Sequence, residues 1–187
     1  MKKIALAMIA VLFLLAAPAT FAQDRGSVGV YADYVRLKHA DNANFWGLGG
    51  RVGFNIHPNV QLEGELSYNF AQSFTNTTTN GGVVSVNTTN LRLMHGLFGP
   101  KFQTTGDAVR VFAVMKGGFL NFSTDKNLGN QFSGINGGDT NGVFYPGGGV
   151  EFFAGWFGFR IEAGDLMYFD RGANHNLRLT IGPQFRF

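Results

Sequence analysis

In most of the alternating segments of this chain, charged residues fall on one face only. In residues 60–70 the even-numbered positions are all apolar or glycine, whereas Glu63 and Glu65 stand among the odd-numbered positions. Residues 176–187 repeat the pattern, with Arg178 and Arg186 on one face and only apolar residues on the other. Such alternation is typical of β-strands. After residue 22 there is no apolar run long enough for a membrane-spanning helix and no sustained 3.6-residue period. The sequence therefore predicts an all-β fold.

Eight alternating segments follow one another, and the intervals between them are long or polar, then short, in turn. The predicted strands are residues 27–36, 45–56, 60–70, 90–102, 108–120, 143–153, 157–167 and 176–187. The long intervals are residues 37–44, 71–89, 121–142 and 168–175. Brief periplasmic turns and longer extracellular loops are typical of outer-membrane barrels. We therefore predict an eight-stranded antiparallel up-and-down transmembrane β-barrel.

The cost of charge in lipid sets the orientation of the strands. A Lys or Arg on the lipid face near the bilayer midplane costs roughly 2–4 kcal/mol, so we expect the charged faces to line the lumen. The residues placed there are Asp33, Arg51, Glu63, Glu65, Lys101, Arg110, Lys116, Glu151, Arg160, Glu162, Arg178 and Arg186. Opposite charges in so narrow a space are expected to pair, because an unpaired buried charge is costly.

Aromatic residues are predicted to form two girdles at the membrane interfaces. The extracellular girdle would contain Tyr34, Trp46, Tyr68 and Tyr168, and the periplasmic girdle Phe102, Trp156, Phe185 and Phe187. Two features do not fit the predicted assignment of inward and outward strand faces. Asp165 falls on an outward face, which requires either a place above the membrane or a β-bulge. The inward face of residues 90–102 carries Leu91, Leu93 and Leu97 instead of polar side chains.

The first 22 residues have the pattern of a cleavable signal peptide. Lys2 and Lys3 precede the apolar stretch 4–17, and Ala22 ends a small-residue cleavage site; cleavage after Ala19 is the alternative. Residues 23–187 would then form the barrel domain, with 13 basic against 12 acidic residues. So small an excess gives no reason to expect a nucleic-acid partner. The chain has no cysteine, which excludes disulfides, thiolate metal sites, cysteine catalysis and a lipoprotein anchor.

Candidate chemistry in the sequence is weak. His39, His57, His95 and His175 have no metal partner at a suitable spacing, and no His-x-Ser pair occurs. Asp170 with His175 would be an acid/base pair at the rim, but a polar loop is the simpler interpretation. Glu63 with Glu65, and Arg160 with Glu162, are interpreted as structural pairs. We therefore predict no catalytic, cofactor-binding or metal site, and a protein that is not an enzyme.

Several segments carry a resemblance to a known family. They are residues 176–187, which close on phenylalanine, together with residues 109–118, 147–152 and 159–165. The chain resembles the small bacterial outer-membrane-protein β-barrels, the OmpA/OmpX-like eight-stranded class. The resemblance implies integration in the outer membrane in contact with its lipids. It also implies delivery by periplasmic chaperones and a terminal strand, with Phe185 and Phe187, that the barrel-assembly machinery reads. A peptidoglycan-binding domain after the barrel is not expected.

These expectations favour a structural or surface-interaction role of the adhesion type. The uncharged residues 71–89 and the Gly- and Asn-rich residues 121–142 would be the contact surface for an extracellular ligand or host surface. The alternatives are a small outer-membrane channel, an outer-membrane lipid-modifying enzyme and a soluble secreted ligand-binding barrel. The last would invert the strand faces and place Arg51, Glu63 and Arg160 in water.

Overall fold

The computed structural model describes residues 25–38, 43–80, 83–124, 140–170 and 172–187, with the backbone alone at 74–80, 83–89 and 124. Within these residues the chain forms one antiparallel sheet. Its strands are β1 (Gly26–Leu37), β2 (Ala43–His57), β3 (Val60–Asn80), β4 (Val83–Gln103), β5 (Val109–Thr124), β6 (Thr140–Ala154), β7 (Phe157–Asp165), β8 (Met167–Phe169), β9 (Ala173–Asn174) and β10 (Leu177–Arg186). No helix within the described ranges is long and apolar enough to cross a membrane.

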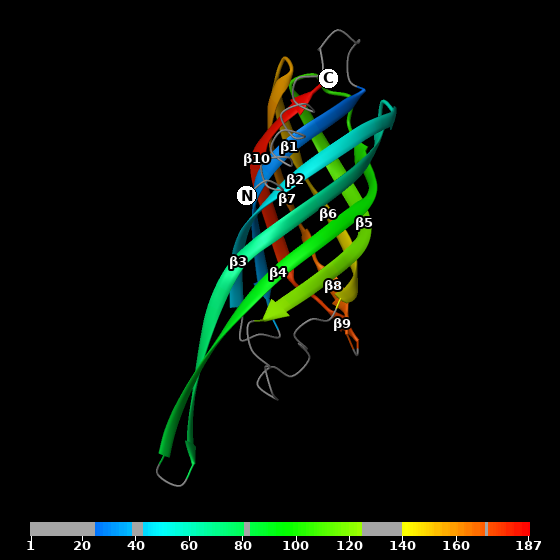
Figure 1. The fold of residues 1–187 in the computed structure, drawn as a ribbon. Helices are drawn as coiled ribbons and strands as arrows, with labels where there is room; N and C mark the ends of the chain where they lie inside the picture. Colours follow the sequence, from blue (N-terminus) through cyan, green and yellow to red (C-terminus); the bar gives the residue numbers. More distant parts are fainter. Residues whose placement is uncertain (1–24, 39–42, 81–82, 125–139, 171) are drawn as a thin grey trace, which may run out of the picture.

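The sheet closes on itself as a barrel (Figure 1). Strands β1 to β7 pair in chain order, β7 pairs with β10, and β10 returns to β1. The short strands β8 and β9 form a hairpin that continues β7 and β10 beyond a break at Leu166 and His175. The ten labelled strands therefore make an eight-stranded barrel, which confirms the predicted all-β architecture.

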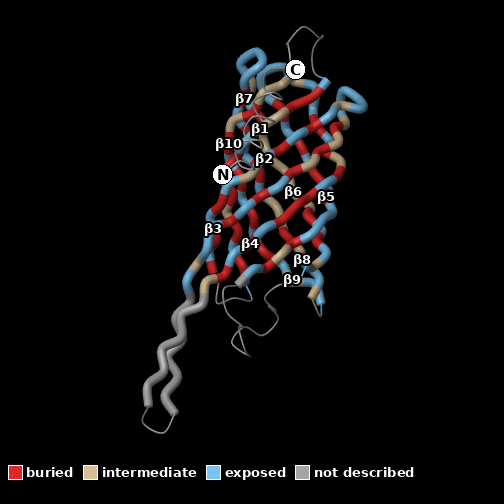
Figure 2. The backbone as a smooth tube through the Cα atoms, viewed as in Figure 1, coloured by how far each residue is buried: buried red, intermediate tan, exposed pale blue. Residues whose placement is uncertain are grey.

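Burial alternates along the strands as the sequence pattern predicts. In β2, inward Phe45 and Arg51 are buried, whereas outward Trp46, Leu48 and Phe54 are about 60% exposed. Figure 2 shows the same alternation of buried and exposed residues around the barrel. Because successive strand side chains point to opposite faces, this single alternation separates an interior from an outer surface.

The hairpin formed by β3 and β4 is longer than predicted. Residues 71–89 were expected to be a loop, but the paired strands continue to Asn80 and resume at Val83. Their register runs from Gln72↔Leu91 to Asn80↔Val83, after an irregularity between Asn69 and Gln72. In Figure 1 this hairpin extends far beyond the rest of the barrel, at the end opposite the chain terminus Phe187. Runs of threonine and valine favour strands, and this preference outweighs the asparagines that indicated a loop.

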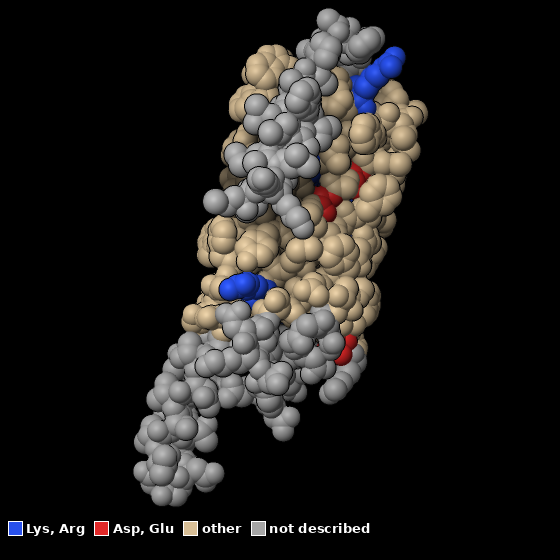
Figure 3. Space-filling model, viewed as in Figure 1, with Lys and Arg blue, Asp and Glu red and all other residues tan. Residues whose placement is uncertain are grey.

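The outer surface between the two ends is apolar. Side chains that are at least 40% exposed include Val30, Ile56, Leu66, Phe98, Val111 and Ile181. Few charged atoms reach this surface in the view of Figure 3. Soluble monomers rarely expose so large an apolar area, so the middle of the barrel is built to contact lipid.

Candidate functional site

The most distinctive feature of the molecule is its barrel interior, which holds a set of buried charges. Ten charged side chains on the inward faces are no more than 7% exposed and form ion pairs with one another. They are Asp33, Arg51, Glu63, Glu65, Lys101, Lys116, Glu151, Arg160, Glu162 and Arg178. We call these ten residues the lumen network. Their burial excludes the inverted arrangement of a soluble barrel with an apolar interior throughout.

Arg160 on β7 is at the centre of the lumen network. Its Nη1 lies 2.5 Å from Oε1 of Glu63 and 3.0 Å from Oε1 of Glu151, and its Nη2 donates to Glu162. Nη2 also donates to the second oxygen of Glu63 at 3.1 Å, so the Glu63 contact is bidentate. A planar guanidinium suits such a fork. One cation therefore links β3, β6 and β7 across the interior.

Lys101 and Lys116 extend the lumen network toward β4 and β5. Nζ of Lys116 lies 2.9 Å from Glu63, 3.2 Å from Glu65 and 3.6 Å from Glu162. Nζ of Lys101 lies 2.6 Å from Oε1 of Glu151. An ammonium group is a compact charge that can approach several carboxylates at once, and Lys116 does so with three.

Arg178 and Arg51 complete the lumen network on the side of β1, β2 and β10. Arg178 donates from Nε to Asp33 at 2.8 Å and from Nη1 to Glu65 at 2.6 Å. Arg51 lies 3.0 Å from Glu65 and 3.2 Å from Glu162. The lumen network thus comprises five carboxylates and five cations, and its formal charge is zero.

Aromatic rings cover the guanidinium groups of the lumen network. The guanidinium of Arg160 lies 3.9 Å from the ring centroid of Phe112. Arg178 lies 4.9 Å from the ring of Tyr145, and Arg51 lies 4.6 Å from the ring of Tyr31. Such cation–π contacts are stronger in desolvated sites. The rings were not singled out from the sequence, although each lies on an inward face.

The interior toward the long β3–β4 hairpin is apolar instead of charged. Its buried residues are Val35, Leu37, Ala43, Phe45, Leu91, Leu93, Leu120, Phe122, Val143, Leu166 and Tyr168. We call these residues the apolar plug. On the outside at the same level, Arg36, Asn44, Arg92 and Ser123 are exposed. In the membrane band the interior is charged and the exterior apolar, whereas at this level the interior is apolar and the exterior polar. This part of the barrel therefore has the core of a water-soluble protein.

The apolar plug settles the two open questions of strand phase. Leu91, Leu93 and Leu97 do point inward. The interior around Leu91 and Leu93 is apolar, whereas Leu97 lies opposite Glu65 at the level of the lumen network. Asp165 is outward and partly exposed at the rim, where Oδ2 lies 2.5 Å from Nδ1 of His175. The alternation of β7 continues through buried Leu166, so no bulge shifts its phase.

Tyr168 was placed wrongly in the extracellular girdle. It is 1% exposed and packs edge-on against Phe122 at 5.5 Å between ring centroids. Glu162, Leu166 and Tyr168 share the inward face of β7 and β8, so the ring enters the apolar plug. The acid/base pair of Asp170 with His175 that the sequence offered is not seen either, because His175 contacts Asp165.

His95 stands at the boundary between the lumen network and the apolar plug. It is fully buried, and Nε2 lies 3.7 Å from Oδ2 of Asp33. Neither ring nitrogen makes a hydrogen bond. Among the described residues no group of three or more His, Asp and Glu side chains is arranged to hold a metal ion. His39 lies outside these residues.

Exposed aromatic side chains lie at both ends of the apolar band. Tyr34 and Trp46 have ring centroids 4.8 Å apart, and Tyr68 is 46% exposed on the neighbouring strand. At the opposite end Trp156 is 67% exposed and stacks on Phe185 at 5.4 Å. Tyr and Trp rings with one apolar and one polar part suit membrane interfaces.

Two arginines that were predicted to line the lumen with the other charges, Arg110 and Arg186, lie outside the lumen network, at the end with the short turns. Arg110 is buried, and Nε donates to Gly106 O at 2.7 Å. Arg186 is only half-buried, and Nε donates to Gly155 O at 2.6 Å. Both guanidinium groups lie over the ring of Phe153, at 5.3 and 4.6 Å from its centroid. The seven predicted bases therefore divide into five in the network and two at the mouth.

The arrangement of strands agrees with solved membrane barrels. The attachment invasion locus protein Ail of Yersinia pestis, in complex with the heparin analogue sucrose octasulfate, superimposes with a TM-score of 0.54 over 87% of this chain and 96% of its own, at 13% identity. Neisserial surface protein A superimposes with a TM-score of 0.59 over 87% and 97%, at 12% identity. The fold is that of the small outer-membrane β-barrels. The sequence itself matches no family model and no curated protein.

This fold accounts for the combination of an apolar exterior and a charged interior. An outer-membrane β-barrel satisfies every strand edge by closure, and eight strands enclose a space that side chains can fill. Residues 1–24 lie outside the described part of the chain. The signal peptide over residues 1–22 and its cleavage after Ala22 or Ala19 therefore stay predictions.

Proposed function

We propose that this chain is an integral outer-membrane barrel that is closed to solutes and acts through its extracellular surface. The observation that carries the proposal is the filled interior. The lumen network occupies one part of the barrel and the apolar plug the next. An ion passing through would have to displace paired charges and then leave them for an apolar core, and both steps are costly. This argues against the small-channel alternative.

The proposed contact surface is the β3–β4 hairpin. Residues 69–91 contain no charged side chain, and eight of them are Thr or Ser. Strand β3 pairs with β2 up to Asn69, and β4 pairs with β5 from Leu91 onward. Among the described residues no other strand pairs with the hairpin beyond these points, so it offers two strand edges that can pair with another chain. This favours a partner recognised by neutral hydrogen bonds.

The known ligand of a structural neighbour sharpens this proposal. The Ail structure contains sucrose octasulfate, a polyanion. Polyanions are recognised by clusters of Arg and Lys, and residues 69–91 contain neither. We therefore expect the hairpin of this chain to prefer a neutral glycan or a polypeptide over a sulfated glycan.

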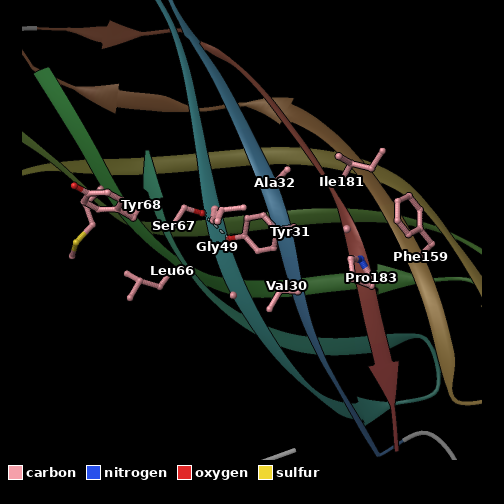
Figure 4. A pocket seen from close by; sticks show the side chains of 14 residues that line it. Val30, Tyr31, Ala32, Gly49, Leu66, Ser67, Tyr68, Phe159, Ile181 and Pro183 are labelled. Atoms are coloured by element: carbon pink, nitrogen blue, oxygen red, sulfur yellow. Dashed lines mark hydrogen bonds between the residues drawn. The ribbon is translucent and has the colours of Figure 1, made fainter. Parts of the chain in front are cut away.

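Outer-membrane lipids are the proposed partners of the apolar band. Its surface has a depression of about 720 Å³ over β10, β1, β2 and β3. Figure 4 shows Ala32 between Tyr68 and Leu66 on one side and Ile181 and Phe159 on the other. The depression continues the lipid-contacting surface, so acyl chains are its natural occupants. Periplasmic chaperones and the barrel-assembly machinery are the proposed partners during biogenesis, through Phe185 and Phe187.

Conductance measurements test the closed barrel. The purified protein is reconstituted in planar bilayers, and we expect no reproducible stepwise openings at moderate voltage. Discrete openings that recur with one unit conductance would contradict the proposal and favour the channel. Electrophoresis with and without boiling checks that the reconstituted protein is folded, since a folded barrel migrates differently when unheated.

A hairpin deletion tests the surface role. Residues 73–90 are replaced by Asn-Gly, a pair that closes two-residue hairpins well. We expect the shortened protein to reach the outer membrane in normal amounts and to lose adhesion of expressing cells to host cells and neutral glycans. A matched control replaces residues 125–139 by the same pair. Full adhesion by the shortened protein would refute the role of the hairpin.

A further inference from the structure

The β3–β4 hairpin continues beyond the barrel as a two-stranded ribbon (Figure 1). Its register is uninterrupted from Gln72↔Leu91 to Asn80↔Val83. Among the described residues, β3 has no strand beside it other than β4 beyond Asn69, and β4 has none other than β3 on the hairpin side of Leu91. An isolated two-stranded ribbon is only marginally stable in water. This ribbon would therefore gain stability from further strands on its two edges.

The ribbon lacks the residues that usually prevent exposed strand edges from pairing. Natural sheets protect their edges with charged side chains, especially lysine, and with proline. Residues 72–91 contain no Lys, Arg, Asp, Glu or Pro. Thr and Val, which favour strands, occupy most of positions 75–79 and 83–89. Because the segment is neutral, nothing in it repels an identical copy, and uncharged segments with a high strand preference tend to stack on their own kind.

The two faces of the ribbon differ in composition, because alternate positions of a strand belong to opposite faces. The register pairs of one face contain only β-branched residues. They are Thr75↔Thr88, Thr77↔Val86 and Thr79↔Val84. The register pairs of the other face contain three asparagines. They are Asn76↔Asn87, Thr78↔Ser85 and Asn80↔Val83. A further strand of the same composition would place β-branched residues beside β-branched residues and polar residues beside polar ones, which are favourable cross-strand neighbours.

A membrane gives every copy of the chain the same orientation and the same height. Strand β3 runs away from the barrel in the ribbon, and β4 runs back toward it. The edge of β3 in one copy is therefore antiparallel to the edge of β4 in a neighbouring copy, whereas two β3 edges would be parallel. Antiparallel ladders are slightly more stable per residue. At equal height, Thr77 of one copy would lie opposite Val86 of the next, which repeats the pairing within the hairpin.

We propose that the hairpins of neighbouring copies pair edge to edge, with β3 of one copy joined to β4 of the next. The partner of the hairpin is thus a second copy of this chain, and the inference rests on the proposed extracellular position of the hairpin. The contact joins two different edges, so every pair leaves one edge of each kind open. Heterologous contacts of this type build open assemblies instead of closed dimers. The copies therefore form rows in the plane of the membrane.

Cross-linking in the outer membrane tests the pairing, because the chain has no cysteine of its own. Thr77→Cys copies with one tag are expressed together with Val86→Cys copies with another tag, and the cells are treated with a mild oxidant. Opposite Cα atoms of an antiparallel ladder are about 4.5–5.5 Å apart, which suits a disulfide. We expect dimers that carry both tags to exceed dimers that carry one tag twice severalfold. Asn87→Cys is the matched control, because its position belongs to the other face, and it should cross-link severalfold less with Thr77→Cys.

A charge exchange tests the same ladder without a covalent bond. Donor- and acceptor-labelled copies are reconstituted in vesicles, and energy transfer between them measures their association. Thr78→Lys alone should lower the transfer severalfold, and mixing Thr78→Lys copies with Ser85→Glu copies should restore it, because the two positions are opposite each other in the register. A transfer that stays low in the mixture would contradict the pairing of β3 with β4. Heat-dependent migration checks that each variant is folded.

The outcomes also separate the pairing from the proposed surface role. Cross-links mainly between identical variants, or equal cross-linking of Val86→Cys and Asn87→Cys, would overturn the pairing of β3 with β4. Cells that form no cross-link and still adhere to host cells and neutral glycans through the hairpin would refute the pairing and leave the surface role intact. Cross-linked rows on cells that do not adhere would support the pairing and refute adhesion alone.

Discussion

At the scale of the residue, what matters most is that nine of the ten members of the lumen network contact more than one oppositely charged member. Glu63 is fully buried and contacts Arg160, Lys116 and Lys101. Removing one charge from a neutral buried set costs more than the lost contact, because the remaining charge is left without compensation. Alternation in the sequence was enough to place these side chains inside. It could not predict their partners, because pairing depends on the stagger between strands, which the face pattern leaves undetermined.

The loss of stability caused by substitution of Glu63 should therefore be reduced by removing one of the cations that Glu63 contacts. Glu63→Gln keeps the volume but leaves five cations against four carboxylates, and we expect a loss of about 3–5 kcal/mol in the free energy of unfolding. Adding Lys116→Met should restore much of it. Urea unfolding in detergent measures both, with exposed Lys38→Gln as the control expected to stay within about 0.5 kcal/mol. A double variant less stable than Glu63→Gln alone would contradict charge balance as the cause.

Glycine positions offer a second contrast between two residues. A Cβ at Gly149 would lie 2.0 Å from the carbonyl oxygen of Ile161, whereas a Cβ at Gly50 would meet nothing within 4 Å. The backbone of β7 cannot yield as a side chain can. Gly149→Ala should therefore destabilise the barrel by about 1–3 kcal/mol, and Gly50→Ala should leave it unchanged. Equal denaturation midpoints for the Gly149→Ala and Gly50→Ala variants would show that β6 and β7 can move apart more easily than their packing indicates.

At the scale of the element, the strand ends were the least predictable part of the fold. Barrel strands were recognised where one face faces lipid, because only there does charge mark the other face. Beyond the membrane that constraint disappears, so residues 71–89 looked like a loop although they form the β3–β4 hairpin. The apolar plug was missed for the same reason. Leucines on an inward face indicate a plug only once it is known that the barrel extends past the bilayer.

The closing pair of strands is interrupted at one place. The register between β1 and β10 passes from Gly29↔Gln184 to Ala32↔Ile181 and omits Pro183. A proline has no N–H to donate to a ladder. Near the chain end the pairing is firm again, since Phe187 O accepts from Arg25 N at 2.7 Å and from Gly26 N at 2.9 Å. The backbone of the last residue therefore closes the barrel.

The terminal strand allows assembly to be separated from stability. Phe187 is 47% exposed, so Phe187→Ala should cost no more than about 1.5 kcal/mol in the refolded barrel. If the assembly machinery reads this ring, the amount of barrel in the outer membrane should nevertheless fall severalfold. Phe185→Ala should be more destabilising in vitro, because its ring stacks on Trp156. Normal membrane levels of the Phe187 variant would argue against the assembly role.

At the scale of the whole molecule, polarity changes twice along the barrel axis. From the short turns to the long hairpin, the interior passes from the lumen network to the apolar plug, while the exterior passes from apolar to polar. These changes set the height at which the barrel sits in the bilayer. The eight-stranded architecture was predictable from the sequence because closure follows from alternation and loop lengths together. The division of the interior into the lumen network and the apolar plug could not be predicted, because it depends on where each strand crosses the membrane surface.

The two tryptophans report this height directly. Trp46 and Trp156 are both more than 60% exposed and lie at opposite ends of the apolar band. In single-tryptophan variants, Trp46→Phe and Trp156→Phe, we expect the remaining fluorescence to be quenched most by lipids brominated near the headgroup. Lipids brominated near the chain end should quench both weakly. Strong quenching of either residue by the deep label would place the barrel at a different level.

The neutrality of the lumen network also constrains how the sequence can evolve. Loss of Glu63 alone during evolution would leave a buried cation without its counter-charge. Substitutions at this position should therefore occur together with substitutions at Arg160, Lys116 or Lys101, which lie on three other strands. The outward positions carry no such obligation and are free to drift among apolar residues. When diverged copies of this gene are compared, the interior should therefore change in matched pairs of opposite sign, and those pairs alone would suffice to reconstruct the stagger of the barrel.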